Sequence, residues 1–285
     1  MNANKNILGA LEKGEIEAVQ RIVNSKLGEY KKTNQIIKED IFKILEMNCK
    51  VIYYPIEDDE ICGFVYSFKN HKFVYINSYM PYEKQIFTAA HELYHIWYSD
   101  TKTGELLKSV VLEETINFRD IKTEDLKANR FGAEFLVPKD VLLNELQIRN
   151  ISKNLIGLRD IVELMDIFLV PYKTLVRRLY EIDYLAEDKC LEFLKEETRK
   201  EDEGVILWQK RLKLCKRNNE RTKEIKFGDM IDMVLRLYEK KQITYDKLKY
   251  ILSLSNCTPD EFNIEEEKNI LPSEEDILKI LEEEE

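Results

Sequence analysis

The sequence predicts an α+β fold with a mainly helical C-terminal region. Three observations predict it: runs rich in Val, Tyr, Phe and Ile between residues 50 and 77, apolar residues at helical spacing after Pro81, and helical patterns through most of the chain beyond residue 123. At 285 residues the chain is long enough for more than one unit. We expect an N-terminal helical segment at 1–47, an α+β core at 48–140, a helix-turn-helix-like element at 141–185, and a charged helical region with an acidic tail at 186–285.

Composition predicts a cytoplasmic protein with a highly charged surface. Hydrophobic residues make up 44% of the chain, charged residues 34%, and the net charge is -10. This charge opposes binding to nucleic acid and to anionic membranes, so neither partner is expected. The five cysteines form no C-x-x-C pair, which argues against a disulfide framework and a cysteine-based zinc site. No secretory signal or membrane-spanning segment is expected.

The first elements are a helix, two strand regions and a second helix. A helical stripe of apolar residues at Ile37, Ile41, Ile44 and Leu45 precedes the strand-like run CKVIYYPI. The next run, ICGFVYSFKNHKFVYINS, predicts a hairpin that turns around residues 69–72. Pro81 then begins a helix that includes the segment FTAAHELYHI.

Later elements are predominantly helical. One helix runs through TEDLKANRFGAEFLV, with Thr123 as a candidate N-cap, and ends at Pro138. Two helices around Val170-Pro171 resemble a helix-turn-helix pair, although two packed core helices are the commoner arrangement. Residues 186–226 alternate in charge as in a solvated helix or linker, and a helical hairpin and a partly disordered acidic tail follow.

The motif His91-Glu92-Leu93-Tyr94-His95 predicts a metal site on the helix after Pro81. Histidines four residues apart lie on one helical face, where both can bind one zinc ion (Zn²⁺) at about 2.0–2.1 Å per nitrogen. Glu92 lies about 100° around the helix from His91, so it can reach water on the metal and act as general base. The motif therefore indicates a zinc hydrolase.

A catalytic zinc ion needs a third protein ligand and an open position for water. A metzincin would have Gly and His at positions 98 and 101, where this chain has Tyr98 and Thr101. His71 is expected at an exposed hairpin tip. We therefore expect a downstream carboxylate, for which the candidates are Glu105, Glu113, Glu114, Asp120, Glu124 and Asp125.

Helical spacing favours Asp125 as this ligand. Asp125 and Asn129 share one helical face, so the first can bind metal while the second hydrogen-bonds a ligating side chain. The small Ala128 and Gly132 would allow a close approach to the motif helix. Glu113 is a reserve candidate in a less clearly helical segment. The competing interpretation of Asp125 is a solvent-facing acid in a first helical turn.

Three segments resemble the ImmA/IrrE family of metallo-endopeptidases. The strand, connector and motif helix of the family resemble FVYINSYMPYEKQIFTAAHELYHI, and its second signature resembles DLKANRFGAEFLVP. A small helical element that follows the family core is similar to LMDIFLVPYKTLVRRLYEIDYL, although this match is weak. Together the segments cover about residues 40–185.

The resemblance implies a thermolysin-like minimal metallopeptidase core, in which a small antiparallel sheet packs on the motif helix. It also implies that His91 and His95 bind zinc, that Glu92 is catalytic, and that the substrate is a helix-turn-helix transcriptional repressor. Two positions depart from the family. Asp125 stands where Glu is usual, so its helix lies closer, Glu124 replaces it, or metal binding is weaker. Tyr94 replaces a usual Gly and is expected to crowd the helix–sheet contact.

These observations favour a cytoplasmic zinc-dependent endopeptidase that cleaves a protein partner and thereby regulates transcription. The alternative is a zincin-fold regulatory or interaction module with weak or no catalysis. A third possibility, a DNA-binding regulator that uses the helices around Val170 and the basic run KRLKLCKRNNERTK, is opposed by the net charge.

Overall fold

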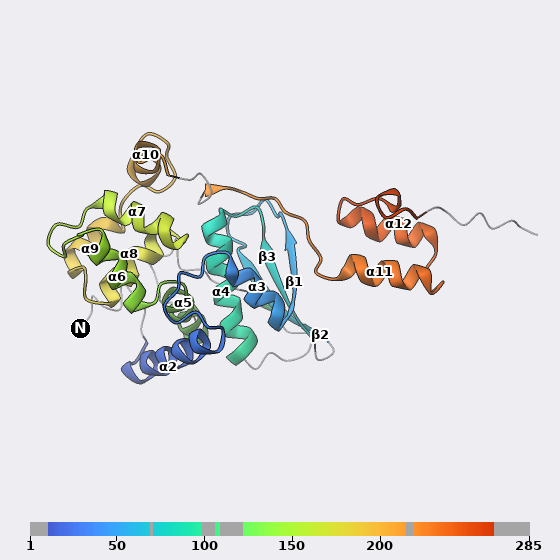
Figure 1. Ribbon diagram of the computed structural model, residues 1–285, viewed down its shortest axis with the longest axis horizontal. Coiled ribbons are helices and arrows are strands. Elements are labelled where there is room, and N and C mark those ends of the chain that lie inside the picture. Colours follow the sequence, from blue (N-terminus) through green and yellow to red (C-terminus); the bar gives the residue numbers. More distant parts are fainter. Residues whose placement is uncertain (1–10, 69–70, 99–105, 109–121, 215–218, 265–285) are drawn as a thin grey trace, which may run out of the picture. The chain divides into compact units, whose positions relative to one another are not determined.

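The computed structural model describes residues 11–68, 71–98, 106–108, 122–214 and 219–264 (Figure 1). The chain divides into two compact units, Met1–Gly228 and Asp229–Glu285. This division falls inside the predicted 186–285 region, while the boundaries predicted at residues 47, 140 and 185 stay predictions. None of the described helices is long and apolar enough to cross a membrane.

The first unit contains a four-stranded sheet with strand order β1-β3-β2-β4. Its strands are β1 (Lys50–Tyr54), β2 (Gly63–Phe68), β3 (His71–Asn77) and β4 (Leu106–Lys108). The predicted hairpin is present, since β2 and β3 are antiparallel with Phe68 opposite His71. However, β1 is parallel to β3, so the sheet is mixed where an antiparallel sheet was expected. The hairpin places β3 between β2 and β1, and this non-local pairing has no local sequence signal.

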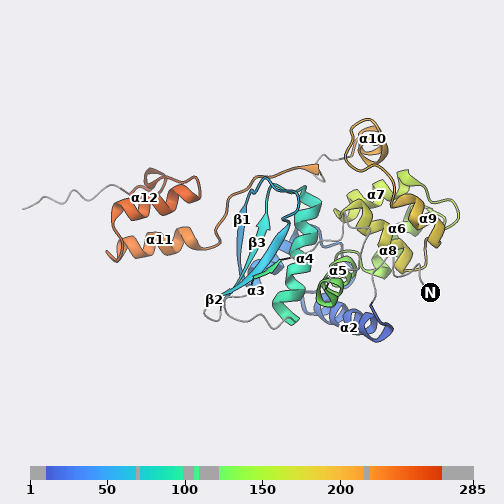
Figure 2. The ribbon, with the colours of Figure 1, turned by 180° about the vertical axis from the view of Figure 1, so that it is seen from behind.

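Nine described helices accompany the sheet in this unit and confirm the α+β fold class. They are α2 (Lys13–Glu29), α3 (Asp40–Asn48), α4 (Tyr82–Tyr98), α5 (Thr123–Leu136), α6 (Lys139–Ile148), α7 (Leu158–Phe168), α8 (Tyr172–Glu181), α9 (Glu187–Phe193) and α10 (Gly204–Arg211). The motif helix α4 lies between the sheet and α5 (Figures 1 and 2). Helix α5 ends before Pro138 as predicted, but its N-cap is Lys122, so the Thr123 N-cap prediction is wrong.

The helices α7 and α8 belong to the same hydrophobic core as the sheet and α4. Phe168, Leu175 and Leu179 are 0% exposed and form one buried cluster with the residues of α4 and α5. Leu169 joins the two helices in the left-handed conformation, with φ of 54°. These two helices are therefore packed core helices, as the commoner interpretation of this sequence predicts.

A buried network of charges joins α8 to α5. Arg178 lies 2.8 Å from Glu181 and 3.6 Å from Glu134, and its Nε donates to the backbone oxygen of Val137 at 2.9 Å. Arg130 completes the network through ion pairs with Glu134 and with Glu181. All four charged side chains are less than 10% exposed. The α7–α8 pair is thereby attached to the helix that carries Asp125.

Replacing Arg178 by Met is expected to destabilise the first unit by about 3–5 kcal/mol, because two buried carboxylates then share the single charge of Arg130 and the oxygen of Val137 loses its partner. Urea denaturation followed by tryptophan fluorescence measures this, since Trp97 and Trp208, the chain's two tryptophans, both lie in the first unit. The matched control is Arg159→Met, at an arginine that is 60% exposed in its pair with Glu163. This control is expected to change the stability by less than about 0.5 kcal/mol. Equal effects of the two substitutions would contradict the role of the network.

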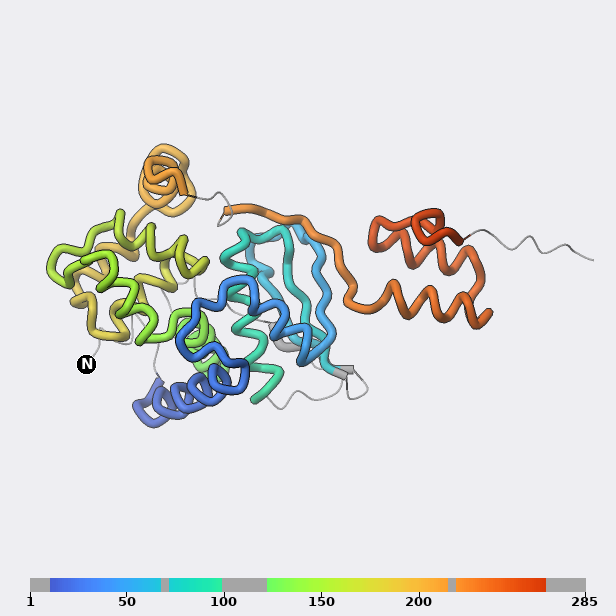
Figure 3. Tube along the Cα trace, in the orientation of Figure 1, coloured from blue at the N-terminus to red at the C-terminus, as the bar shows by residue number. Residues whose placement is uncertain are grey.

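The segment after α10 returns to the sheet and pairs with β1 (Figure 3). Tyr53 and Lys226 exchange two backbone hydrogen bonds, of 2.8 and 3.0 Å. Ser78 accepts from the backbone N–H of Lys223 and donates through Oγ to the carbonyl of Glu224 at 2.6 Å. We call residues 219–228 the return segment. It pairs with the β1 edge of the sheet at Tyr53.

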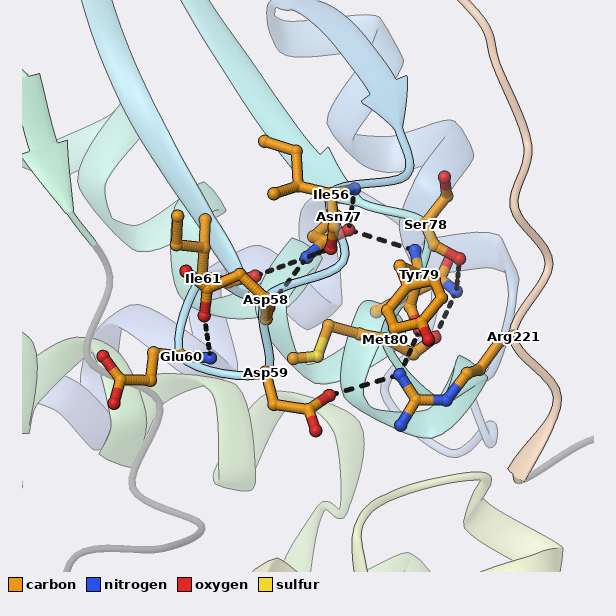
Figure 4. A network of polar contacts seen from close by, with 11 residues as sticks. Ile56, Asp58, Asp59, Glu60, Ile61, Asn77, Ser78, Tyr79, Met80 and Arg221 are labelled. Carbon is orange, nitrogen blue, oxygen red and sulfur yellow. Dashed lines mark hydrogen bonds and ion pairs between the residues drawn. The ribbon is translucent and has the colours of Figure 1, made fainter.

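The loop between β1 and β2 is held by the buried side chain of Asn77 (Figure 4). The amide oxygen of Asn77 accepts from two backbone N–H groups, and its amide nitrogen donates to three carbonyls; the partners are Ile56, Asp58, Ile61 and Tyr79. A fully bonded buried amide fixes the backbone around it. Asn77 therefore fixes the loop that leads into Gly63, the first residue of β2.

The second unit is a small helical hairpin, as the sequence predicts. It contains α11 (Met230–Glu239), α12 (Tyr245–Leu254) and a short 3₁₀ helix, Pro259–Phe262. Its buried core consists of Val234, Leu248 and Leu252. The side chain of Thr244 accepts a hydrogen bond from the backbone N–H of Lys247 and caps α12.

Candidate metal centre

The motif helix α4 places His91, Glu92 and His95 in the interior of the first unit. Apolar neighbours on the same helix, Ile86 and Leu93, are 0% exposed. Because the buried face of the helix includes these residues, the polar residues of the motif are buried with them. His91 and Glu92 are also 0% exposed, and His95 is 3% exposed. Buried polar groups of this kind need hydrogen-bond partners or a metal ion.

Asp125 completes a cluster with the two histidines. The Nε2 atoms of His91 and His95 are 3.1 Å apart, and Oδ1 of Asp125 lies 3.3 Å from Nε2 of His95 and 3.8 Å from Nε2 of His91. These three residues form a buried group whose ligand atoms all lie within 4.8 Å of one another. The structure therefore brings the three predicted ligands together; that they bind metal stays a prediction.

The geometry and chemistry of this cluster fit a tetrahedral divalent ion. Tetrahedral bonds of about 2.0–2.1 Å place neighbouring ligand atoms about 3.3 Å apart, and the three separations lie close to that value. Two imidazoles and one carboxylate are a donor set that zinc uses in hydrolases, where a fourth position stays open for water. Without an ion, two imidazole nitrogens would face each other in the interior.

Asn129 orients the first histidine. Its Oδ1 accepts a hydrogen bond of 3.1 Å from Nδ1 of His91, and the asparagine is 4% exposed. Because an amide oxygen only accepts, Nδ1 must carry the proton, which leaves the lone pair of Nε2 directed at the cluster. The contact predicted from the spacing of Asp125 and Asn129 is thus present.

Replacing Asn129 by Ala is expected to weaken zinc binding about 10–100-fold, because the tautomer and ring orientation of His91 are no longer fixed. Competition with a zinc-binding dye of known affinity measures the change. Asn129→Asp keeps an oxygen acceptor for Nδ1 and is expected to bind zinc more tightly than Asn129→Ala. If the alanine variant binds zinc as tightly as the unchanged protein, Asn129 has no orienting role.

The carboxylate of Glu92 lies beside this cluster, as its electrostatic interaction with Asp125 indicates. Neither of its oxygens has a hydrogen bond within the described residues, although both are buried. Burial, with a smaller contribution from the negative charge of Asp125, raises the pKa of Glu92 well above its usual value. A carboxyl group with a raised pKa is suited to accepting and returning a proton.

The histidine and aspartate pKa values favour the metal-binding protonation states. Burial lowers the pKa of His91, and the contacts with Asp125 and Asn129 oppose this only in part, so the imidazole is neutral. Burial raises the pKa of Asp125, but its contacts with His91 and His95 outweigh this effect and hold it well below its usual value. A neutral imidazole and an ionised carboxylate are the forms that bind metal.

The other carboxylate candidates do not join this cluster within the described residues. Glu124 points away from it, with its side chain 51% exposed and 3.0 Å from Lys127. Helix α5 therefore lies close enough to α4 for the shorter side chain of Asp125 to reach the two histidines. Of the alternatives raised by an aspartate in place of the usual glutamate, this is the closer helix. The candidates Glu105, Glu113, Glu114 and Asp120 lie outside the described residues, as does the side chain of His71.

Tyr94 does not crowd the sheet, so that prediction is wrong. Its ring packs against Phe131 of α5 at 5.8 Å, and its hydroxyl lies 3.5 Å from Glu124. Because α4 is covered on one side by the sheet and on the other by α5, a large residue at this position is accommodated between the two helices. Gly132 of α5 faces Phe87 and the backbone of His91, as its small size predicts.

Gly63 is a site residue that the sequence interpretation missed. A Cβ atom at this position would lie 2.5 Å from Cγ2 of Thr88, 2.7 Å from the backbone oxygen of Tyr75 and 3.4 Å from Oε1 of Glu92. A side chain is therefore excluded, and the backbone of β2 touches the motif helix. The signal was a single glycine at the start of a strand, which often marks a close backbone approach.

The comparisons with known proteins agree with this site. The family model Peptidase_M78, described as the IrrE N-terminal-like domain, matches residues 45–180. The matched range contains the motif of α4, Asp125 and Asn129. No curated protein and no solved structure matches the chain.

Proposed function

Since residues 45–180 belong to the Peptidase_M78 family of metallopeptidases, we propose that the protein is a zinc-dependent endopeptidase that hydrolyses a peptide bond in a protein partner. The observation that carries this proposal is the buried cluster of His91, His95 and Asp125 beside the unpartnered carboxylate of Glu92. Family resemblance alone suggests the partner, a helix-turn-helix transcriptional repressor.

Each side chain has a distinct role in this proposal. His91, His95 and Asp125 would hold the ion, which, when bound, supplies Lewis acidity that polarises a peptide carbonyl and lowers the pKa of water. Glu92 would take a proton from the attacking water and return it to the amine that leaves. Asn129 would keep the His91 ring in the ligating tautomer.

We assign the substrate to the β4 edge of the sheet, at the end where β2 begins, because β4 is the edge strand opposite β1 and pairs with β2 from Phe64 onward. An extended peptide can add to a sheet edge by backbone hydrogen bonds. The return segment already uses the β1 edge at Tyr53. At the start of β2, Gly63 lies beside Oε1 of Glu92, so a peptide held near this end would lie close to the general base.

Cleavage of a protein substrate tests the proposal. The zinc-loaded protein is incubated with purified helix-turn-helix repressors and with casein as a general substrate, and mass spectrometry identifies the fragments. Zinc-dependent fragments that are absent with the Glu92→Gln protein are the expected result. A protein that contains zinc but cuts none of these substrates would contradict an endopeptidase.

The burial of the cluster favours a second candidate, a zincin-fold regulatory module. His91, Glu92, His95 and Asp125 are all 8% exposed or less, whereas catalysis needs contact with a peptide carbonyl. In that case the protein would be soluble with well under one zinc ion per chain, or would bind its partner without cutting it. Metal analysis together with the cleavage assay separates the two candidates.

A further inference from the structure

Three buried oxygens on one face of α4 have no hydrogen-bond partner within the described residues. They are Oγ1 of Thr88 and both carboxylate oxygens of Glu92, and the two side chains are 0% exposed. Buried hydroxyls and carboxylates are normally bonded to protein groups or to ordered water. An unbonded buried group loses its hydrogen bonds to water, and no new hydrogen bond offsets that cost in free energy. The missing hydrogen-bond partners of Thr88 and Glu92 therefore call for a common explanation.

Thr88 continues the polar stripe of the motif by one turn. It precedes Glu92 by four residues, so these two side chains lie on one helical face. Both Thr88 and Glu92 also border the same point of the sheet. A Cβ atom on Gly63 would lie 2.5 Å from Cγ2 of Thr88 and 3.4 Å from Oε1 of Glu92. The two side chains thus lie next to each other against the start of β2.

We propose that Thr88 positions the carboxylate of Glu92 through one ordered water molecule that bridges the two side chains along α4. A threonine hydroxyl both donates and accepts, so it can hold a water molecule that in turn donates to a carboxylate oxygen of Glu92. The catalytic consequence rests on the proposed function, whereas the contact itself does not.

A purely structural role for Thr88 leads to a different expectation. In that case the side chain only fills space against Gly63, and valine, which has the same shape, would replace it without effect on Glu92. Threonine in a helix can also bond its hydroxyl to the carbonyl four residues earlier, but Oγ1 of Thr88 makes no such bond. The pair Thr88→Val and Thr88→Ser therefore separates the hydroxyl from the shape.

The first test measures coupling between Thr88 and Glu92 without any enzyme assay. Thermal unfolding of the full-length metal-free protein is compared for Thr88→Val, Glu92→Gln and the double variant. The change in Tm caused by Glu92→Gln is expected to differ by at least about 2 °C between the two backgrounds. Thr174→Val, at a buried threonine of α8, is the control and is expected to add independently. Additive changes for Thr88→Val as well would overturn the proposal.

The second test measures hydrolysis by the zinc-loaded variants. Thr88→Val is expected to lower kcat roughly 10-fold or more with little change in KM or zinc content, because the general base is no longer held in place. Thr88→Ser keeps the hydroxyl and is expected to stay within about 3-fold of the unchanged protein. An unchanged kcat for the valine variant, or an equal loss for both variants, would overturn the positioning role. If the unchanged protein hydrolyses nothing, the proposed function fails, and the coupling test still decides whether Thr88 contacts Glu92.

Discussion

Zinc content is expected to fall from about one ion per chain to well under half when Asp125 is replaced by alanine. Asp125 is the only acidic side chain of the cluster, and two histidines alone are too few protein ligands for a catalytic zinc ion. Because loss of a group that merely orients a ligand already costs 10–100-fold, we expect affinity to fall at least about 100-fold. Mass spectrometric metal analysis after dialysis measures both the amount and the identity of the ion.

Glu124→Ala is the matched control for this substitution. It removes a carboxylate from the adjacent position of α5, but one that points to Lys127 and solvent. Full zinc content is expected for this variant. If Glu124→Ala lost the metal and Asp125→Ala retained it, the assignment of the third ligand would be reversed, and retention by both would place the ligand elsewhere in the chain.

Glu92→Gln is expected to lower hydrolysis by about 10²–10⁴-fold while the zinc content stays unchanged. Glutamine has nearly the shape of glutamate but cannot accept and return a proton. The residue does not belong to the group of three candidate ligands, so the ion should remain. Initial rates at saturating substrate, with metal content measured on the same samples, check this outcome. Unchanged cleavage would exclude Glu92 from the mechanism.

The same substitution is expected to stabilise the metal-free protein at neutral pH. Burial raises the pKa of Glu92 in the folded state, so the unfolded chain loses this proton first, at a pKa of about 4.3. The folded state is therefore penalised progressively as the pH rises above that value. We expect Glu92→Gln to add at least about 1 kcal/mol at pH 7 and little at pH 4, since one pKa unit corresponds to 1.36 kcal/mol. A stability gain at pH 4 equal to that at pH 7 would contradict this origin.

Local patterns in the sequence identified the centre of the fold and the site. The helical spacing of apolar residues after Pro81 predicted α4, and the spacing of His91 and His95 predicted their convergence. The i and i+4 relation between Asp125 and Asn129 predicted both the approach to the histidines and the hydrogen bond to His91. These predictions depend only on helix geometry, which is fixed over a few residues.

Features that depend on residues far apart in the chain were not predictable in this way. The parallel pairing of β1 with β3, the return of Lys226 to Tyr53 and the contact of Gly63 with Glu92 join segments without a local signal. Tyr94 is another example. The helical pattern of apolar residues indicated that Tyr94 is buried, but not that Phe131 of α5 would pack against it. Periodicity specifies which face of an element is buried, and tertiary packing decides what buries it.

The return segment also bears on the solubility of the protein. An uncovered sheet edge offers its N–H and C=O groups to other molecules and promotes aggregation. In this chain, Lys226 already bonds both backbone groups of Tyr53. A proteolytic cut or an engineered stop before residue 219 would therefore remove more than the C-terminal helices. It would leave the backbone groups of Tyr53 at the β1 edge unpaired, and the shortened protein is expected to aggregate more readily than the full-length chain.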